Sequence, residues 1–388
     1  MGILQKNSVF GIKKVMLTLF IAVVSFNTLA NGPDAHGETV ERLVEESNAI
    51  SEAHIAPKED KEKFDAVKMI MHHISDAHEF HVVGDVTVAL PVILYTEKGL
   101  VTFMSSEFDH DDHGHKVFVK NDERFVKNHE HIYYASEEPD AHGAFVNLDE
   151  NGLVLNAAPL DFSITKNVFS MFMSALLLLI IFISVAASYK KKGVTSAPSG
   201  FQNLMETLIL FVRDEIVRPN ITASKADKFF PYLLTVFFFI WINNMIGLVP
   251  FFPFSSNLTG NIAFTMTMAI CTMVITNVNG NKNYWGHIFW MPGVPTAMKI
   301  VLAPIELIGV FTKPFALMVR LFANITAGHI IILSLISIIF IMGASWSALS
   351  GPLTLFMNVL ELLVAFLQAY VFTLLSALFI GQAVDEHH

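Results

Sequence analysis

Charged residues are scarce in this chain, and they are distributed unevenly. Only 15% of its 388 residues are Asp, Glu, Lys or Arg, whereas 53% are hydrophobic. Residues 31–160 carry 26 acidic and 10 basic residues. The long stretch 229–382 holds only six charged residues, namely Lys282, Lys299, Glu306, Lys313, Arg320 and Glu361. This contrast predicts one acidic aqueous half joined to one membrane half.

Three further absences narrow the class of protein. Cys271 is the one cysteine, so no disulfide can form within the chain. The acidic balance argues against nucleic acid as a partner, since a nucleic-acid binder needs a basic face. The sequence also has no P-loop and no other nucleotide-binding glycine fingerprint. We therefore expect no cofactor, and we expect that the chain carries out no nucleotide chemistry itself.

The N-terminus has the pattern of a secretory signal peptide. Lys13 and Lys14 precede an apolar run over 15–26, and the small-residue end 28–30 resembles a cleavage site. The run is short for a membrane span of about 20 residues. We expect residues 1–30 to be a signal peptide, with an uncleaved anchor as the alternative.

An extracytoplasmic domain is expected to follow over residues 31–160. Its first part is polar and His-rich, with helical potential around 59–74. β-Branched and aromatic residues then predict strands over 81–95 and 100–104, joined by a turn at 97–99, with shorter strands near 116–120 and 131–134. We read 79–155 as a small β-rich domain.

The remaining residues, 161–388, form the predicted membrane domain. Apolar runs predict spans over 168–188, 230–249, 262–279 and 353–380, and a block over 300–342 that is either two segments or one long tilted helix. The amphipathic segment 201–217 suits the membrane interface. The expected fold class is an all-α polytopic membrane protein with about five spans and a long tilted C-terminal helix hairpin, preceded by a signal peptide and a small β-rich extracytoplasmic domain.

Loop charges predict the orientation of these spans in a bacterial inner membrane. The loops 189–228 and 280–299 carry Lys and Arg, whereas 251–261 and 343–352 carry no charge. By the positive-inside rule, the basic loops are cytoplasmic. An exported, periplasmic N-terminal domain and an odd number of spans then leave the C-terminus in the cytoplasm.

Three ionisable residues fall deep in the last two apolar blocks, namely Arg320, His329 and Glu361. Charges at this depth are costly and mark an ion pathway or a buried pair. At about 100° per residue, His329 lies on the face opposite to Arg320. A guanidinium stays protonated and acts as a fixed charge, whereas a carboxyl beside an imidazole can pass protons near neutral pH. A structural Arg320–Glu361 pair is the alternative interpretation.

Other polar residues share faces with these groups. Glu306, Lys313, Arg320 and Asn324 follow one another at spacings of 7, 7 and 4, which places them on one helical stripe. On the last apolar segment Gln368 lies seven residues after Glu361, on the same face.

At these residues the chain resembles subunit a of F-type ATP synthases. Ala316–His329 reads ALMVRLFANITAGH, and Leu367–Phe372 reads LQAYVF, both similar to signature segments of that family. Pro304–Ile308, Lys313-Pro314 and Asn244–Pro250 also match. The resemblance covers roughly residues 160–381 and does not extend to the expected exported domain before residue 160.

The resemblance implies a role for each of the polar residues. Arg320 would face a rotating ring of c subunits and separate two aqueous half-channels, with Asn324 and Gln368 supporting its neighbourhood. His329 and Glu361 would belong to the half-channel open to the exported side. Glu306 would line the path to the cytoplasm. The implied partners are the c ring, b-type peripheral stalk subunits, the rest of the synthase and the lipid bilayer, and the chain itself would not be an enzyme.

Some features leave alternatives open. Gly247 and Asn257 stand where the family often has acidic residues. The coupling ion is H⁺ or Na⁺, with H⁺ favoured by His329. The histidines of 110–115 and 129–131 could bind a metal ion but are more typical of a solvated run, and we expect no metal site.

Two other classes of protein are less consistent with the sequence. A secondary transporter would show internal repeats, and the sequence shows none. A membrane-anchored receptor or scaffold would not need the buried ionisable groups.

Overall fold

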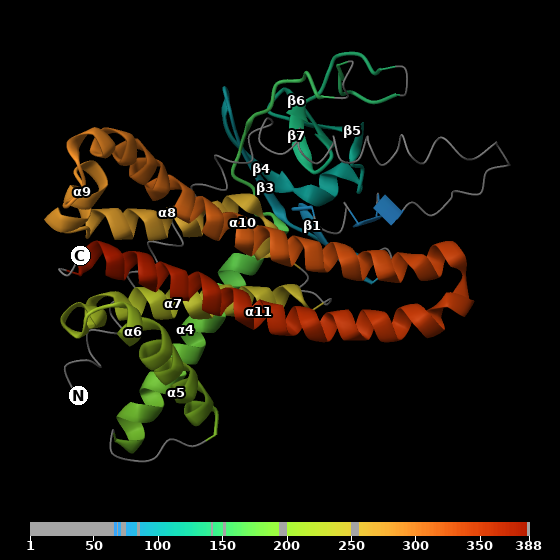
Figure 1. Cartoon of the computed structure of the whole chain (residues 1–388). Coiled ribbons are helices and arrows are strands. Elements are labelled where there is room, and N and C mark those ends of the chain that lie inside the picture. The colour runs from blue at the N-terminus through green and yellow to red at the C-terminus, as the bar shows by residue number, and fades with distance from the viewer. Residues whose placement is uncertain are drawn as a thin grey trace.

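The computed structural model describes residues 66–67, 69–70, 75–83, 86–140, 143–149, 153–193, 200–249 and 256–385. The expected signal peptide and most of the expected helix over 59–74 lie outside these residues. Figure 1 shows two parts, a group of strands and a larger group of helices, with the strands gathered on one side of the helices.

The N-terminal part is a set of small antiparallel sheets. One hairpin pairs β1 (Glu79–Val83) with β2 (Val86–Ala89), and a second sheet has the order β4 (Gly99–Met104), β3 (Pro91–Thr96), β8 (Leu160–Asp161). A third sheet is formed by β5 (His113–Lys120), β6 (Glu123–Asn128) and β7 (His131–Tyr134). The short 3-10 helix η1 (Ser105–Phe108) joins β4 to β5. The expected β-rich domain and its turn at 97–99 are therefore confirmed.

The core of this domain lies between the second and third sheets. In β3 the buried side chains alternate with more exposed ones, as a strand with one covered face requires. Six fully buried apolar residues make the core: Val92, Leu94, Val101, Phe108, Phe125 and Ile132. Phe103 packs edge-on against Phe108, with their ring centroids 5.6 Å apart.

The C-terminal part is helical throughout its long segments. It comprises α4 (Lys166–Lys192), α5 (Phe201–Phe211), the π-helix η2 (Val212–Val217), α6 (Arg218–Asn220), α7 (Ala223–Gly247), η3 (Leu258–Gly260), α8 (Ile262–Val278), α9 (Lys282–Phe289), α10 (Thr296–Met342), η4 (Ala344–Trp346) and α11 (Ser347–Val384). Four of these helices, α4, α7, α10 and the helix ending at Val384, are long and apolar enough to cross a membrane, and α8 with α9 makes a fifth candidate if the bent pair counts as one span. This agrees with the expected polytopic membrane fold.

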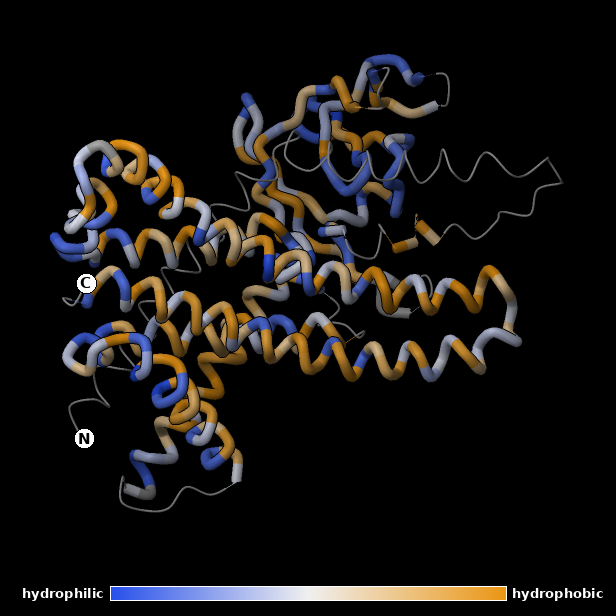
Figure 2. The backbone as a smooth tube through the Cα atoms, in the orientation of Figure 1, coloured by the Kyte–Doolittle hydropathy of each residue, from blue (hydrophilic) through white to orange (hydrophobic). Residues whose placement is uncertain are grey.

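The block over 300–342 forms one continuous helix. Pro304 and Pro314 both lie inside α10, although proline removes a backbone hydrogen-bond donor and usually bends a helix. α10 and α11 run side by side as a long hairpin (Figure 1). Figure 2 shows apolar residues along the whole hairpin and hydrophilic residues near the turns at α6 and α9. The C-terminal hairpin is thus two helices of 47 and 38 residues.

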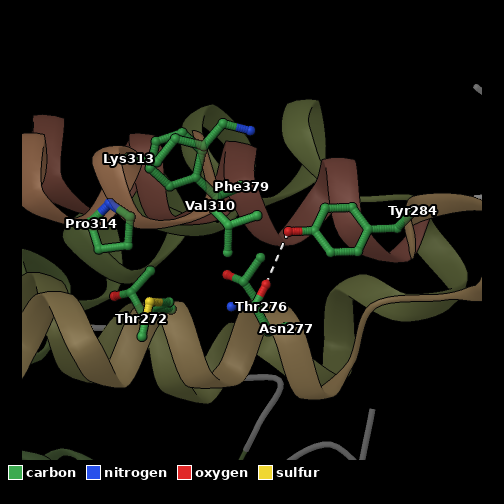
Figure 3. A pocket seen from close by; sticks show the side chains of 9 residues that line it. Thr272, Thr276, Asn277, Tyr284, Val310, Lys313, Pro314 and Phe379 are labelled. Atoms are coloured by element: carbon green, nitrogen blue, oxygen red, sulfur yellow. Dashed lines mark hydrogen bonds between the residues drawn. The ribbon is translucent and has the colours of Figure 1, made fainter. Parts of the chain in front are cut away.

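The helix pair α8 and α9 turns back on itself, bent by 104° at the break between them. Asn281 caps α9 by accepting from the backbone N–H of Tyr284. The Tyr284 hydroxyl in turn donates to Oδ1 of Asn277 on α8 at 3.0 Å (Figure 3). These bonds fix α9 against the end of α8, next to α10.

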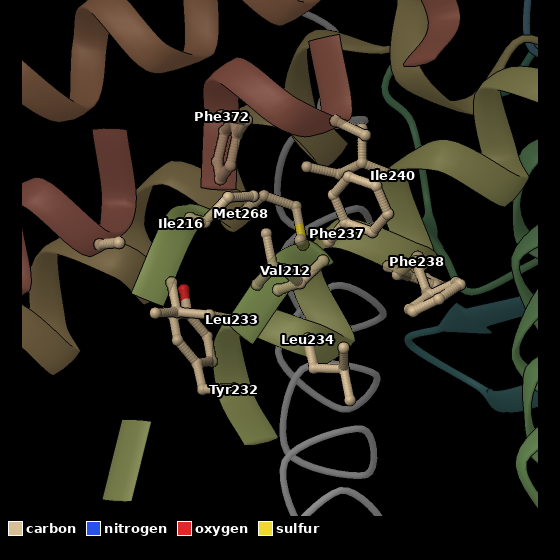
Figure 4. Packing of buried hydrophobic residues seen from close by; sticks show 14 of the residues in the cluster. Val212, Ile216, Tyr232, Leu233, Leu234, Phe237, Phe238, Ile240, Met268 and Phe372 are labelled. Carbon is tan, nitrogen blue, oxygen red and sulfur yellow. The ribbon is translucent and has the colours of Figure 1, made fainter. Parts of the chain in front are cut away.

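The buried core of the helical part lies around α7. Its apolar residues pack against η2, α8 and α11, and Figure 4 shows Phe237, Leu233 and Ile240 of α7 facing this core. Phe372 of α11 and Met268 of α8 complete it (Figure 4). By contrast, α10 keeps most of its apolar surface exposed. A helix that is this apolar and this exposed needs lipid or another protein to cover it.

Candidate functional site

Arg320 lies on the outer side of the α10–α11 hairpin. Its side chain is exposed and borders an open concavity between the two helices. The lining residues are Phe315, Ala316, Val319, Arg320, Ala323, Asn324, Leu367, Gln368 and Val371. Within the described part of the chain, no ion pair or hydrogen bond involves the guanidinium. The structure therefore brings Arg320, Asn324 and Gln368 together and leaves the charge facing outward.

His329 and Glu361 form a separate buried pair. Nδ1 of His329 lies 2.8 Å from Oε1 of Glu361, whose side chain is 3% exposed. The distance is that of an ion pair, although neither carboxylate oxygen meets hydrogen-bond geometry with any described residue. The alternative Arg320–Glu361 pair does not form, because Glu361 points into the helical core and Arg320 points out of it.

Two glycines give this pair its space. A Cβ on Gly328 would lie 3.0 Å from Oε1 of Glu361, so glycine lets α11 bring its carboxylate against α10. A Cβ on Gly247, at the end of α7, would lie 3.8 Å from Nε2 of His329 and 3.3 Å from the Ser256 carbonyl oxygen. The imidazole thus faces the end of α7 and the segment that precedes η3.

α7 contributes an amide to the same region. Nδ2 of Asn244 donates to the carbonyl of Ala365, one turn beyond Glu361, at 3.0 Å. The amide oxygen of Asn244 is buried and has no described partner. A buried polar atom without a hydrogen-bond partner is suited to binding water. In the sequence, Asn244 stands out only as part of the segment Asn244–Pro250 that resembles the family, because an amide in an apolar run gives no signal of its own.

Glu306 lies in a different cavity, near the opposite end of the hairpin. The cavity has a volume of about 250 Å³ and is lined by Asn283, Tyr284, His287, Ile288, Glu306, Val310, Lys313, Gln382 and Asp385. Glu306 precedes Arg320 by 14 residues, which is roughly 20 Å along a helix. His329 follows Arg320 by nine residues. Arg320 therefore lies between two polar regions on α10.

A smaller polar pocket continues this cavity toward the helical core. Thr272, Thr276 and Asn277 of α8 line it together with Val310, Lys313 and Pro314 of α10 (Figure 3). Tyr284, Val310 and Lys313 border both spaces. The contribution of α9 and of the chain end was not predicted; His287 could have been suspected from its place in a polar turn, whereas Gln382 and Asp385 carry no local pattern.

The histidines of 110–115 and 129–131, all of which the structure describes, do not converge on a metal site. His113 stacks edge-on with His129 at 6.0 Å between ring centroids, and Nδ1 of His110 lies 2.7 Å from Oε2 of Glu79. Among the described residues, no group of three His, Cys, Asp or Glu side chains has the arrangement of a metal site.

Comparison with known proteins identifies the helical part. The family model of the ATP synthase A chain matches residues 168–381, which span α4 through almost all of α11. The chain belongs to this family. A second family model, described as a domain of unknown function, matches residues 69–162. The family therefore covers the hairpin with both polar regions but not the N-terminal domain.

Several curated relatives in this family are similar over most of the helical part. ATP synthase subunit a 2 of Chlorobaculum tepidum is 48% identical over 243 residues, which are 60% of this chain and 67% of the relative. ATP synthase subunit a of Chloroherpeton thalassium is 47% identical over 240 residues, covering 59% and 70%. The subunit a of an Anaeromyxobacter species is 42% identical over 276 residues, covering 69% and 64%.

Membership of the subunit a family assigns the chain to the membrane sector of the ATP synthase complex, which translocates protons. Its apolar helices agree with that membrane location. Arg320, Asn324, His329, Glu361, Gln368 and Glu306 all lie inside the matched range.

Proposed function

We propose that this chain is the stator-side subunit whose Arg320 meets the carboxylates of a rotating c ring. The observation that carries the proposal is the exposure of Arg320 on the open side of α10, without an ion-pair partner among the described residues. A permanent charge at membrane depth is costly unless a partner faces it. An exposed guanidinium between two apolar helices therefore suits an acidic partner from another chain.

The fixed charge would couple ion flow to rotation. A carboxylate that passes Arg320 is favoured in its ionised form, because opposite charges nearby stabilise that form. The same carboxylate must be neutral to move through the hydrocarbon, where a bare charge costs several kcal/mol. The guanidinium cannot carry a proton itself. Protons would then cross the membrane only while bound to a ring carboxylate that rotates from one side of Arg320 to the other.

The two polar regions on α10 would serve as half-channels. His329 and Glu361, with Asn244 beside them, form a buried polar site suited to the exported side. Glu306 and its cavity, which includes Lys313, are suited to the cytoplasmic side. Asn324 and Gln368 border the concavity of Arg320, where they would orient the meeting carboxylates. The imidazole of His329 favours H⁺ as the coupling ion, because its ring nitrogens can bind a proton and are poor ligands for Na⁺.

The orientation of the chain follows from the same proposal. Residues 31–160 would be periplasmic, after a signal peptide over 1–30, and the membrane domain 161–388 would end in the cytoplasm of a bacterial cell. The exposed apolar surfaces of α4 and α10 would contact lipid, the c ring and b-type stalk subunits. ATP chemistry would reside in the other subunits of the complex.

Replacement of the arginine tests this function. We expect Arg320→Ala to abolish ATP-driven proton pumping in inverted vesicles, while the detached catalytic head still hydrolyses ATP. Arg218→Ala is the matched control, because Arg218 is exposed on α6 and pairs with Asp214 of η2 at 2.8 Å rather than with a residue of the hairpin. Normal pumping by the Arg320 variant would contradict the assignment.

A further inference from the structure

A carboxylate of the N-terminal domain lies at the first turn of α4. Oδ1 of Asp76 accepts from the backbone N–H of Asn167 at 3.0 Å, and Oδ2 accepts from the Thr165 hydroxyl at 2.9 Å. The next residue, Ala77, accepts from the backbone N–H of Lys166 at 2.9 Å. Asp76 is therefore part of the N-terminal domain in the sequence, but its side chain accepts hydrogen bonds from residues at the start of α4.

The polar contacts continue from α4 toward the helical core. Ser256 donates its hydroxyl proton to Oδ1 of Asn167 at 2.6 Å. Asn167 is 6% exposed and Ser256 is 1% exposed, whereas Asp76 is only partly covered. The three side chains thus lead from the aqueous surface into the protein interior.

The series of polar contacts from Asp76 through Asn167 to Ser256 ends beside His329. The carbonyl oxygen of Ser256 and Nε2 of His329 both face the space above Gly247, at 3.3 Å and 3.8 Å from the position that a Cβ would take. Polar atoms that face the same space can be bridged by water. On its other side, Nδ1 of His329 lies 2.8 Å from Glu361.

Both cationic and acidic groups surround Asp76. Lys166 on α4 and His78 at the start of the domain favour its ionised form, and Glu130 and Glu79 act on Lys166 in turn. Burial nevertheless outweighs the hydrogen bonds and these cations, and it raises the pKa of Asp76 above its ordinary value. The carboxyl therefore gains and loses its proton closer to neutral pH than a free Asp does.

We propose that Asp76 is the proton-exchanging carboxyl at the exported mouth of the half-channel that ends at His329 and Glu361. Asp76 would take a proton from the aqueous side and release it to water held by Asn167 and Ser256. The proton would then pass the open space at Gly247 to the imidazole. This inference rests on the proposed function, and it gives the N-terminal domain a part in proton uptake.

The test measures proton conduction in vesicles that contain the whole complex, before and after removal of the catalytic head. Asp76→Asn keeps an oxygen that can accept from Asn167 but removes the exchangeable proton. We expect passive conduction through the stripped membrane sector to fall about tenfold, less than the roughly hundredfold effect typical of a positioned acid or base, because water still reaches Ser256. The pH dependence of the remaining conduction should also flatten.

Rescue separates proton exchange from a purely structural role. Asp76→Glu should restore most of the conduction, and Asn167→Asp in the Asp76→Asn background should restore part of it. Glu107→Gln, an exposed acid-to-amide change in η1 of the same domain, should have no effect. Should Asp76→Asn impair assembly, Ser256→Ala decides the matter, because it breaks the line while leaving the contacts of Asp76 with α4 in place.

Conduction by assembled Asp76→Asn, or by Ser256→Ala, at the native rate and pH dependence would overturn the inference. Failure of the proposed function would look different. Normal pumping by Arg320→Ala would refute that function whatever the Asp76 variants do. An inactive Arg320→Ala together with native conduction by Asp76→Asn would refute only the role of Asp76.

Discussion

Nδ1 of His329 lies 2.8 Å from Oε1 of Glu361, and the two residues come from different helices of one long hairpin. The contact joins the C-terminal half of α10 to the N-terminal half of α11, at the level of the C-terminal end of α7 and of Ser256, which precedes η3. It leaves Arg320, on the opposite face of α10, without a partner from the described chain. The His329–Glu361 pair and the permanently charged Arg320 therefore lie on opposite faces of α10.

The buried pair should be functionally coupled. Each of His329→Ala and Glu361→Ala should reduce ATP-driven pumping at least about tenfold, because each leaves a buried polar partner unpaired. The exchange variant His329→Glu/Glu361→His should recover part of the activity, since it restores the contact. Pumping is measured by fluorescence quenching in inverted vesicles. An exchange variant no better than either single change would argue against direct coupling.

Gly247 should be needed for open space rather than for backbone freedom. Gly247→Val would place methyl groups between the Ser256 carbonyl and His329, where even a Cβ would lie 3.3 Å from that oxygen. We expect passive proton conduction to fall several-fold while the complex still assembles. Gly309→Val is the control, because Gly309 is also helical but nothing lies within 4 Å of its added Cβ. Equal conduction by the two variants would contradict the expected obstruction.

The N-terminal domain should lose stability in mildly alkaline solution. Burial by itself lowers the pKa of His78, but the carboxylates of Asp161 and Glu130 outweigh it and raise that pKa to about 9. The protonated imidazole is therefore bound more tightly in the folded state. Its contribution is fully present below the unfolded value of about 6.5 and is lost as the pH rises through about 9.

The size of this effect can be measured on the full chain by proteolysis of the domain during unfolding in urea. His78→Gln should lower the free energy of unfolding by on the order of 3 kcal/mol below about pH 6.5, with the difference shrinking toward pH 9. His115→Gln, at an exposed position of β5, should change little. A loss of stability that is the same at pH 6 and pH 9 would show that His78 acts through packing alone.

The helical part was predictable from the sequence because its signals are local and strong. Long apolar runs predicted α4, α7 and the final helix, with bounds that differ from the observed ones by up to seven residues, and the 3.6-residue period placed Arg320 and His329 on opposite faces of α10. Whether residues 300–342 form one helix or two was not predictable. Pro304 and Pro314 each allow a break, and only packing of α10 along its neighbours decides for a single helix.

β6 of the N-terminal domain was not predicted. Its residues Glu123–Asn128 carry charges that a sequence pattern assigns to a solvated loop, whereas Lys127 is in fact buried between Glu130 and Asp112.

The contacts that join the two domains could not be predicted either. Asp76 and Asn167 are 91 residues apart in the sequence, so nothing local marks them as neighbours. Hydrogen bonds across such separations are visible only in the folded structure.

A density map of the assembled complex tests the central claim most directly. The account predicts that the Arg320 side of α10, with Asn324 and the Gln368 side of α11, faces the helices of the c ring, with a ring carboxylate opposite the guanidinium. A map in which this concavity faces lipid, or in which Arg320 turns back against its own chain with no ring carboxylate near it, would contradict the account.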